Sequence, residues 1–179
     1  MEFRPDPIIA EALWKLPTTS VPDTVWKHTF VRQSPTTPNV RGARWNPRGV
    51  PAIYLATDRK TALAEGRYLA GQQPQAIKKD RQIHALRIDG LKNVLDLRDR
   101  RTLRALGVSE TELESPDHGA CQLIGGTAEW AGYDAMLVPS ARAEGANLVV
   151  FERKTGETFE MSVIGSEAIE PDEGRTAPE

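Results

Sequence analysis

Residues 44–68, RWNPRGVPAIYLATDRKTALAEGRY, restrict the fold of this chain more than any other segment, because a turn, a strand and a helix follow one another directly. Residues 46–49 have proline at the second and glycine at the fourth position, which is typical of a type I turn. Residues 52–56 form an apolar run of strand length, and residues 59–70 have helical periodicity. A strand that leads at once into a helix indicates a fold in which both kinds of element share one core.

The helix expected at 59–70 has a candidate cap and a carboxylate at the edge of its apolar face. Thr57 or Asp58 can accept hydrogen bonds from the first free backbone N–H groups of this helix. The apolar face comprises Ala62, Leu63, Gly66, Leu69 and Ala70. Glu65 lies at the border of that face, where a carboxylate costs free energy unless it has partners. Glu65 is therefore a candidate for a functional site.

The other elements are strands and helices in irregular order. We expect a short helix over 7–16 that ends before Pro17, a strand over 25–30 and a loop over 33–43. Two strands are expected in QIHALRIDG (82–90) and NVLDL (93–97), and three more at 133–139, 147–153 and 159–165. Helices are expected at 99–106, 110–114 and 117–130. This mixture favours an α+β class, with one domain over 1–169 and a flexible tail over 170–179.

The charge balance argues against a general nucleic-acid-binding protein. The chain has 179 residues, a net charge of −2 and an isoelectric point near 6.0, whereas nucleic-acid binders normally have a basic excess. Basic clusters occur at 78–81 and 98–104, and the second is interpreted as the solvated face of a helix. We expect no direct contact with nucleic acid.

Cysteine content and hydropathy indicate a cytoplasmic protein. Cys121 is the only cysteine, so an internal disulfide is impossible and a reducing compartment fits. No apolar run approaches the ~20 residues of a membrane span. The first residues lack the basic region and long apolar core of a signal peptide. We expect no membrane partner.

Several common site motifs are missing or weak. Gly125 and Gly126 fit neither the dinucleotide-binding fingerprint nor the phosphate-binding loop of nucleoside triphosphatases. The histidines lack metal-ligand spacing, so we expect no metal site. His118 precedes Cys121 by three residues, which suggests either a thiol–imidazole pair or the packed start of a helix. With no third orienting group visible, packing is the favoured interpretation.

Three residues of the 44–68 segment have the chemistry of a ligand pocket. Arg44 can emerge from the turn, and a guanidinium grips phosphate through two parallel hydrogen bonds. Tyr54 lies in mid-strand, where its ring could stack on a flat cationic ligand. Glu65 adds the carboxylate. Taken singly, each has an ordinary explanation: an exposed turn arginine, a core tyrosine or a solvated helix glutamate.

Together these residues resemble a known family. The pattern R-W-N-P-x-G-x-x-x-x-Y-L-A, the following A-L-A-E, and VPSARAEGANLVVF with Ser140 are similar to the RES family. That family is named for arginine, glutamate and serine and comprises NAD-consuming toxins of bacterial toxin–antitoxin operons. The resemblance covers residues 25–151, and Arg44, Tyr54, Glu65 and Ser140 match the family's pocket residues.

The resemblance implies a fold and a set of NAD contacts. It implies a split β-sheet like that of ADP-ribosyltransferases, with NAD as substrate in the cleft and no prosthetic group. Glu65 would stabilise the cation that forms on the ribose, Arg44 would hold the pyrophosphate and Tyr54 would stack on nicotinamide or its ribose. Ser140 would fix a polar atom near the scissile bond, and Trp45 and Asn46 are counted as further NAD contacts.

One family position is ambiguous in this chain. The family usually has another arginine in its first strand, where this chain offers Lys27 or, five residues later, Arg32. If Lys27 takes that position, a point charge replaces a planar fork. The sequence leaves both residues as candidates for NAD binding.

The acceptor of the ADP-ribosyl group is open at this stage. Water would make the protein an NAD glycohydrolase, inorganic phosphate an NAD phosphorylase, and a protein side chain a mono-ADP-ribosyltransferase. Arginine-specific transferases use Glu-x-Glu at the catalytic position, whereas this chain has Leu63 two residues before Glu65. This favours NAD destruction over protein modification. The resemblance also implies a cognate antitoxin, a helix-turn-helix repressor, and a catalytically silent binding module is the remaining alternative.

Overall fold

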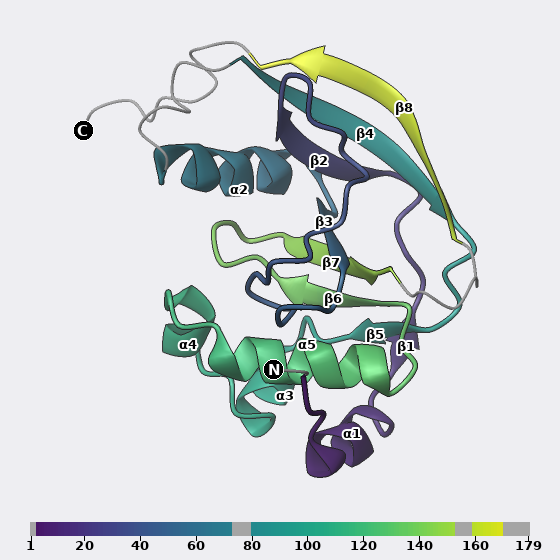
Figure 1. Ribbon diagram of the computed structural model, residues 1–179, viewed down its shortest axis with the longest axis vertical. Coiled ribbons are helices and arrows are strands. Elements are labelled where there is room, and N and C mark those ends of the chain that lie inside the picture. The colour runs from purple at the N-terminus through teal and green to yellow at the C-terminus, as the bar shows by residue number, and fades with distance from the viewer. Residues whose placement is uncertain (1–2, 73–79, 153–158, 170–179) are drawn as a thin grey trace.

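The computed structural model describes residues 3–72, 80–152 and 159–169. The helices are α1 (Pro7–Leu13), α2 (Arg59–Gly71), α3 (Arg100–Ala105), α4 (Glu110–Glu114) and α5 (Gly119–Trp130) (Figure 1). The strands are β1 (Thr18–Thr19), β2 (Val25–Phe30), β3 (Ala52–Ala56), β4 (Arg81–Asp89), β5 (Val94–Asp96), β6 (Ala135–Pro139), β7 (Ala146–Phe151) and β8 (Glu160–Ala168). The α+β class is confirmed.

Within these residues the strands form one sheet in the order β1-β5-β6-β7-β3-β2-β4-β8. Only β5 and β6 run parallel among the described pairs. The β2–β3 junction consists of a single register pair, Trp26 with Ala56, whereas β3 and β7 pair over five residues from each strand. The sheet is therefore nearly split, with β2, β4 and β8 on one side of an opening and the other strands on the other (Figure 1).

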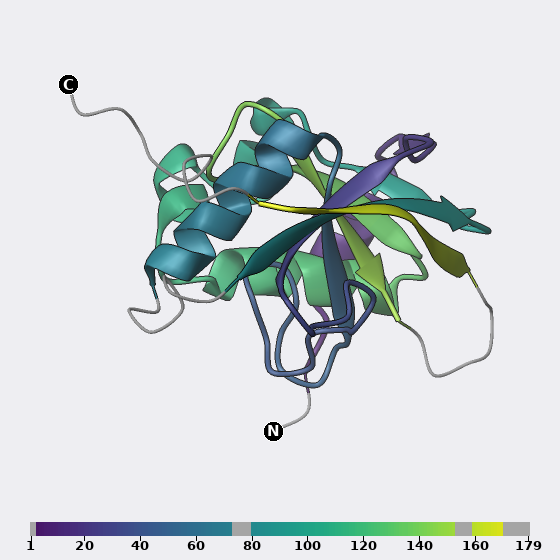
Figure 2. The same ribbon diagram turned by 90° about the horizontal axis from the view of Figure 1, so that it is seen from above.

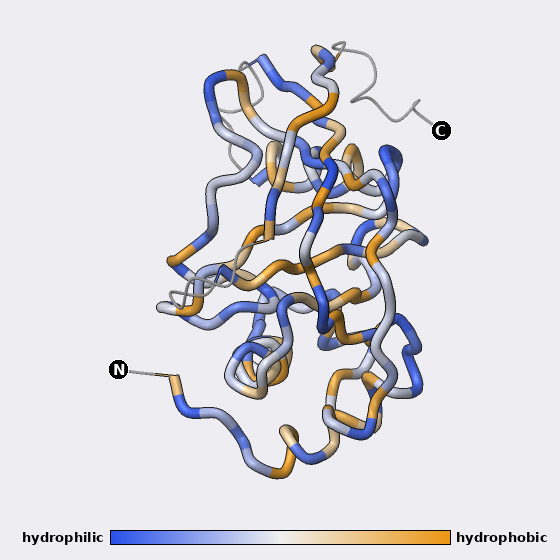
Figure 3. Tube along the Cα trace, turned by 90° about the vertical axis from the view of Figure 1, so that its right-hand side faces the viewer, coloured by the Kyte–Doolittle hydropathy of each residue, from blue (hydrophilic) through white to orange (hydrophobic). Residues whose placement is uncertain are grey.

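Helices cover the two parts of the sheet differently. α2 packs mainly against β2 and also contacts β3 and β4, so it lies beside the opening (Figures 1 and 2). α5 packs against β6, and α1 and α4 pack against α5. Apolar residues concentrate along the central strands (Figure 3), where every residue of β6 is buried, whereas β8 is mostly exposed. None of the described helices is long and apolar enough to cross a membrane.

A glycine lets α5 approach the turn at residues 44–47 by direct backbone contact. A Cβ atom at Gly125 would lie 1.7 Å from the carbonyl oxygen of Trp45, so any larger residue would push the turn away. The Trp45 side chain is 1% exposed and packs in the same cluster as Ile124 and Met136. The Gly125–Gly126 pair is thus explained by packing.

Most expected elements are present, with differences at their ends. Asp58, rather than Thr57, caps α2 by accepting a hydrogen bond from the Thr61 backbone N–H at 2.8 Å. The helix expected over 7–16 ends at Leu13, because Pro17 has no backbone N–H to donate to the Leu13 carbonyl, which accepts from Leu16 at 3.0 Å instead. β1 was not expected, since two residues carry no periodic signal.

Two further expectations need correction, and a third concerns residues that the structure does not describe. Leu69 was expected on the buried face of its helix but is 56% exposed, because that part of α2 borders the pocket described below. β8 continues to Ala168 instead of ending at 165, since it pairs with β4 as far as Gln82. The tail expected over 170–179 lies outside the described residues.

Candidate active site in the opening of the sheet

A pocket of about 390 Å³ lies where β2 and β3 separate. This volume is in the range of small-molecule sites. Its polar lining comes from distant parts of the chain and includes Lys27, Arg44, Tyr54, Glu65, His118 and Arg142. Among the described residues that line it, Glu65 is the one carboxylate, and it shares the pocket with Lys27, Arg44 and Arg142.

Glu65 is held in one orientation by two hydrogen bonds to the same oxygen. Ser140 Oγ donates to Glu65 Oε1 at 2.6 Å, and Asn147 Nδ2 donates to it at 2.8 Å. Within the described part of the chain, Oε2 has no hydrogen-bond partner, so one carboxylate oxygen stays available to a ligand. The two donors offset the cost of placing a carboxylate beside the apolar face of α2.

Ser140 lies behind Glu65 and is fixed in turn by its own loop. The side chain is 2% exposed and does not line the pocket. Its Oγ accepts hydrogen bonds from the backbone N–H groups of Arg142 at 3.0 Å and Ala143 at 3.1 Å. With one donated and two accepted bonds, the hydroxyl has used its full capacity. Ser140 therefore connects the β6–β7 loop to the carboxylate.

Tyr54 is tied to the turn through its hydroxyl. The Oη atom donates to Asn46 Oδ1 at 2.7 Å and accepts from the Trp45 backbone N–H at 2.9 Å. Burial raises the pKa of Tyr54 well above its usual range, so the phenol stays protonated. Its ring lines the pocket in a fixed position.

Lys27 bridges the opening of the sheet. Its Nζ donates to the carbonyl oxygen of Tyr54 at 2.6 Å, at a place where β2 and β3 no longer pair. Burial lowers the pKa of Lys27 to about 8, because the charged ammonium is largely removed from water. Arg32, the other candidate, lies after the end of β2 with a φ of 75° and does not line the pocket.

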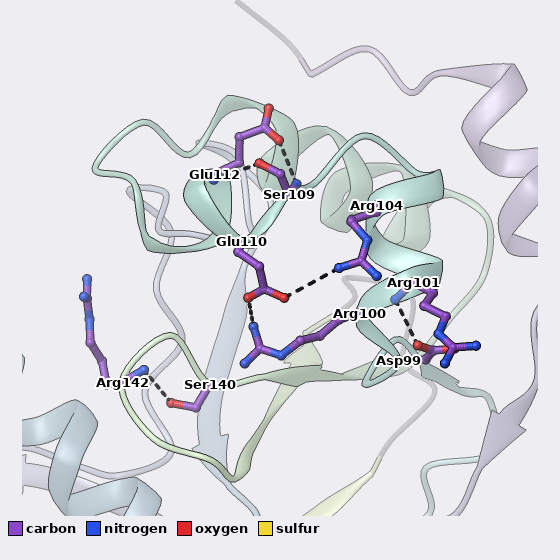
Figure 4. A network of polar contacts seen from close by, with 9 residues as sticks. All are labelled: Asp99, Arg100, Arg101, Arg104, Ser109, Glu110, Glu112, Ser140 and Arg142. Atoms are coloured by element: carbon purple, nitrogen blue, oxygen red, sulfur yellow. Dashed lines mark hydrogen bonds and ion pairs between the residues drawn. The ribbon is translucent and has the colours of Figure 1, made fainter.

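Two arginines face the pocket without an acidic partner among the described residues. Arg44 Nη1 donates to the Ser115 carbonyl at 3.1 Å. The Arg142 guanidinium lies over the Tyr68 ring, with Cζ 3.4 Å from the ring centroid. Figure 4 shows the backbone bond from Arg142 to Ser140 and the Arg142 side chain extending away from it. The pocket therefore has a basic wall.

The family of the chain follows from comparison with known proteins. The model of the RES domain matches residues 13–171. This chain belongs to the RES family. The match extends through the pocket residues from Lys27 to Asn147 and covers nearly the whole RES chain described here.

Named relatives of this RES protein occur in mycobacteria. NAD(+) phosphorylase MbcT of Mycobacterium tuberculosis, strain H37Rv, is 29% identical over 119 residues, and so is MbcT of Mycobacterium bovis. These alignments cover 64% of this chain and 63% of each relative, so the chain spans just under two thirds of their length. The probable NAD(+) phosphorylase Rv3189 of M. tuberculosis is 30% identical over 149 residues, covering 80% of this chain and 71% of that protein.

The fold of the RES chain has a solved counterpart. The crystal structure of the M. tuberculosis MbcT–MbcA toxin–antitoxin complex contains a chain that superposes with a TM-score of 0.80. The two share 23% identity, with 94% of this chain and 96% of the other covered. This likeness confirms the overall architecture.

Trp45 and Asn46 differ from the expectation that they contact a ligand. They are 1% and 0% exposed, and neither lines the pocket. Asn46 Nδ2 donates to the carbonyls of Asn39 at 3.0 Å and Val50 at 2.8 Å, which holds the turn closed. In this RES chain the two residues shape the turn from which Arg44 emerges.

Asn147 and His28 line the pocket but were not expected from the sequence. Asn147 is a polar residue within the apolar run of β7, and that interruption is a signal that was available. His28 Nε2 is buried and has no hydrogen-bond partner in the described part. Burial, followed by the positive charges of Arg81 and Lys27, lowers the pKa of His28 to about 4. His28 is thus neutral at pH 7, with one unsatisfied nitrogen at the pocket.

Cys121 and His118 do not form the thiol–imidazole pair considered above. Cys121 is 1% exposed, and no hydrogen bond joins it to His118 in the described structure. Burial raises the pKa of the Cys121 thiol to about 11, so it is not a thiolate at neutral pH. Packing at the start of α5 is confirmed. No cluster of three or more metal-ligating side chains occurs in the described ranges.

Proposed function

We propose that this RES protein cleaves the bond between nicotinamide and ribose in NAD. The observation that carries the proposal is Glu65, oriented by two donors to Oε1 and with Oε2 available in a basic pocket. The names of its relatives, which are NAD(+) phosphorylases, support NAD as the substrate. One domain would carry the whole site.

The chemistry suits a single oriented carboxylate. Nicotinamide is a cation on C1″ of the ribose and leaves as a neutral molecule. Its departure passes through an oxocarbenium-like state, as in glycoside hydrolysis. A fixed negative charge beside C1″ stabilises that state more than the ground state, which is the condition for catalysis. We assign this role to Glu65, with Ser140 and Asn147 as positioning residues.

The other pocket residues suit the rest of NAD. Arg44 would hold the pyrophosphate through the guanidinium nitrogens that do not bind Ser115. The Tyr54 ring, immobilised through its hydroxyl, would stack on nicotinamide or its ribose. Lys27, rather than Arg32, would take the family's first-strand position, because it lines the pocket.

Inorganic phosphate is the acceptor that we propose. The relatives are named phosphorylases, and Leu63 leaves the chain without the Glu-x-Glu pair of arginine-specific transferases. The nearly split sheet, with a pocket at the split, is consistent with an origin in the ADP-ribosyltransferase fold. NAD would be consumed as a substrate, without a prosthetic group.

We further propose that an antitoxin controls this activity. The similar solved chain is a toxin in complex with its antitoxin MbcA, which supports a protein partner for this chain. The net charge of −2 suits a division of labour in which a helix-turn-helix antitoxin contacts DNA and the toxin does not. The single cysteine suits action in the cytoplasm.

The test is to incubate the purified chain with NAD, with and without phosphate, and to separate the products. Nicotinamide with ADP-ribose-1″-phosphate, formed only when phosphate is present, is the expected result. Free ADP-ribose without phosphate dependence would indicate a glycohydrolase instead. Intact NAD after long incubation would contradict the proposed activity, and labelling of an added protein would indicate a transferase.

A further inference from the structure

Arg142 is a cation whose guanidinium N–H groups have no hydrogen-bond acceptor among the described residues. Its guanidinium lies over the Tyr68 ring, with Cζ 3.4 Å from the ring centroid, and forms no ion pair with the described residues. Stacking uses the face of a guanidinium and leaves its N–H groups free around the edge. Both side chains line the pocket, so these donors can reach a ligand there.

The position of Arg142 is fixed relative to Glu65 by two separate connections. Tyr68 follows Glu65 by three residues on α2, so the two side chains share one side of the helix. On the other route, Ser140 Oγ binds both the Glu65 carboxylate and the backbone N–H of Arg142. The first connection places the Arg142 guanidinium over a neighbour of Glu65 on α2, and the second holds the Arg142 backbone, so an anion bound by Arg142 would share the pocket with the Glu65 carboxylate.

His118 adds a neutral donor to the same wall. Its pKa is lowered mainly by burial and then by the positive charge of Arg44; Asp117 acts in the opposite direction, and Arg142 adds a smaller lowering. His118, Arg44 and Arg142 all line the same pocket. Arg44, His118 and Arg142 come from three different loops, so the fold gathers them in one place.

We infer that Arg142, with His118 beside it, is the binding site of the free phosphate that attacks NAD, an inference that rests on the proposed phosphorolysis. Two arginines would then serve two different phosphate groups. Arg44 would take the pyrophosphate of NAD, and Arg142 would take the incoming anion next to Glu65. The positive charge of Arg142 also offsets the repulsion between that anion and the carboxylate.

The reaction balances without an added base. An oxygen of HPO₄²⁻ forms a bond to C1″, while the C1″–N bond breaks and its electron pair neutralises the pyridinium. The products are nicotinamide and a phosphate ester that carries one proton, which it later releases to water. The total charge of the reacting groups is unchanged. Holding the phosphate in place supplies the proximity that such a displacement needs.

The experiment compares Arg142→Gln, Arg142→Lys and the wild type in two measurements. The first is calorimetric titration of each protein with inorganic phosphate in the absence of NAD. The second is steady-state turnover with phosphate and NAD varied separately. Arg101→Gln is the matched control, since Arg101 is an exposed arginine of α3 away from the pocket.

We expect Arg142→Gln to weaken phosphate binding, and to raise the KM for phosphate, about tenfold or more. The KM for NAD should change less than threefold, and Arg101→Gln should match the wild type. The phosphate affinity of Arg142→Lys should lie between those of the wild type and Arg142→Gln, because lysine keeps the charge but cannot form two parallel hydrogen bonds. If thermal denaturation shows that Arg142→Gln is unfolded, the phosphate affinity of Arg142→Lys tests the assignment instead.

Two results would overturn the assignment. One is phosphate affinity in Arg142→Gln equal to that of the wild type. The other is a raised KM for NAD with an unchanged KM for phosphate, which would assign Arg142 to the pyrophosphate of NAD. If the wild type does not turn over NAD, the proposed function fails, and the titration without NAD still decides whether Arg142 binds phosphate.

Discussion

Two groups of arginines in this protein have opposite surroundings. In and near α3, arginines are close in sequence and paired with acids: Arg98 with Asp96 at 2.6 Å, and Arg100 and Arg104 with Glu110 (Figure 4). In the pocket, Arg44 and Arg142 are far apart in sequence and have no acidic partner among the described residues. The first group is also more exposed to water.

The comparison shows that the local density of charge in the sequence does not indicate which arginines line the pocket. Three arginines of the basic run at 98–104 form exposed ion pairs, which contribute little stability. The pocket arginines are partly buried and not neutralised, which costs stability unless a ligand supplies the missing charge. A protein retains such an arrangement when the function requires it.

The sharpest way to break the pocket arrangement is to remove its carboxylate. Glu65→Gln keeps the shape and deletes the charge that would face C1″, so we expect kcat to fall by about 10²-fold or more. Affinity for NAD should change much less, because C1″ carries little charge before the bond breaks. Glu114→Gln on the exposed face of α4 is the control. Full NAD consumption by Glu65→Gln would disprove the mechanism.

Substitution of Arg44 tests whether catalysis requires the planar guanidinium of a pocket arginine or only its positive charge. Arg44→Lys should lower kcat/KM about tenfold, or ~1.4 kcal/mol, because a lysine cannot bind Ser115 and a phosphate group with the same geometry. Arg48→Lys, an exposed position in the same turn, should leave kcat/KM unchanged. Wild-type kinetics for Arg44→Lys would remove this residue from the phosphate contacts.

Lys27 is a pocket cation whose lowered pKa should make the stability of the protein depend on pH. Its pKa is about 8 in the folded protein and near 10.5 when unfolded, so the unfolded state binds more protons between these values. The free energy of unfolding should therefore rise with pH from about 8 to 10.5. Denaturant melts across this range should show a smaller rise for Lys27→Met, which cannot titrate. An identical pH dependence in both proteins would mean that Lys27 is well hydrated.

The smallest effect is expected in the paired group. Arg100→Gln removes an exposed ion pair with Glu110 and should change the free energy of unfolding by less than about 1 kcal/mol. NAD turnover should equal that of the wild type. A loss of activity comparable to that of Arg44→Lys would show that the two groups of arginines are functionally connected, contrary to the distinction made here.

Local sequence determined the elements around the pocket with good accuracy. The turn at 46–49, the strand at 52–56 and the helix that starts at Arg59 were predictable because their signals act within a few residues. Asp58 caps the helix as one of two expected residues. The family pattern with Arg44, Tyr54, Glu65 and Ser140 was also visible before any coordinates.

Only the tertiary structure decided how these elements combine into a pocket. Asn147 reaches Glu65 from another strand, Arg142 reaches Tyr68 from another loop, and Lys27 lines the opening whereas Arg32 does not. The tertiary structure also shows that Trp45 and Asn46 are buried in the turn and do not line the pocket. Periodicity and capping report contacts between near neighbours in the chain. The charge and hydrogen bonding of this site depend on contacts between distant segments, which form only where the sheet opens between β2 and β3.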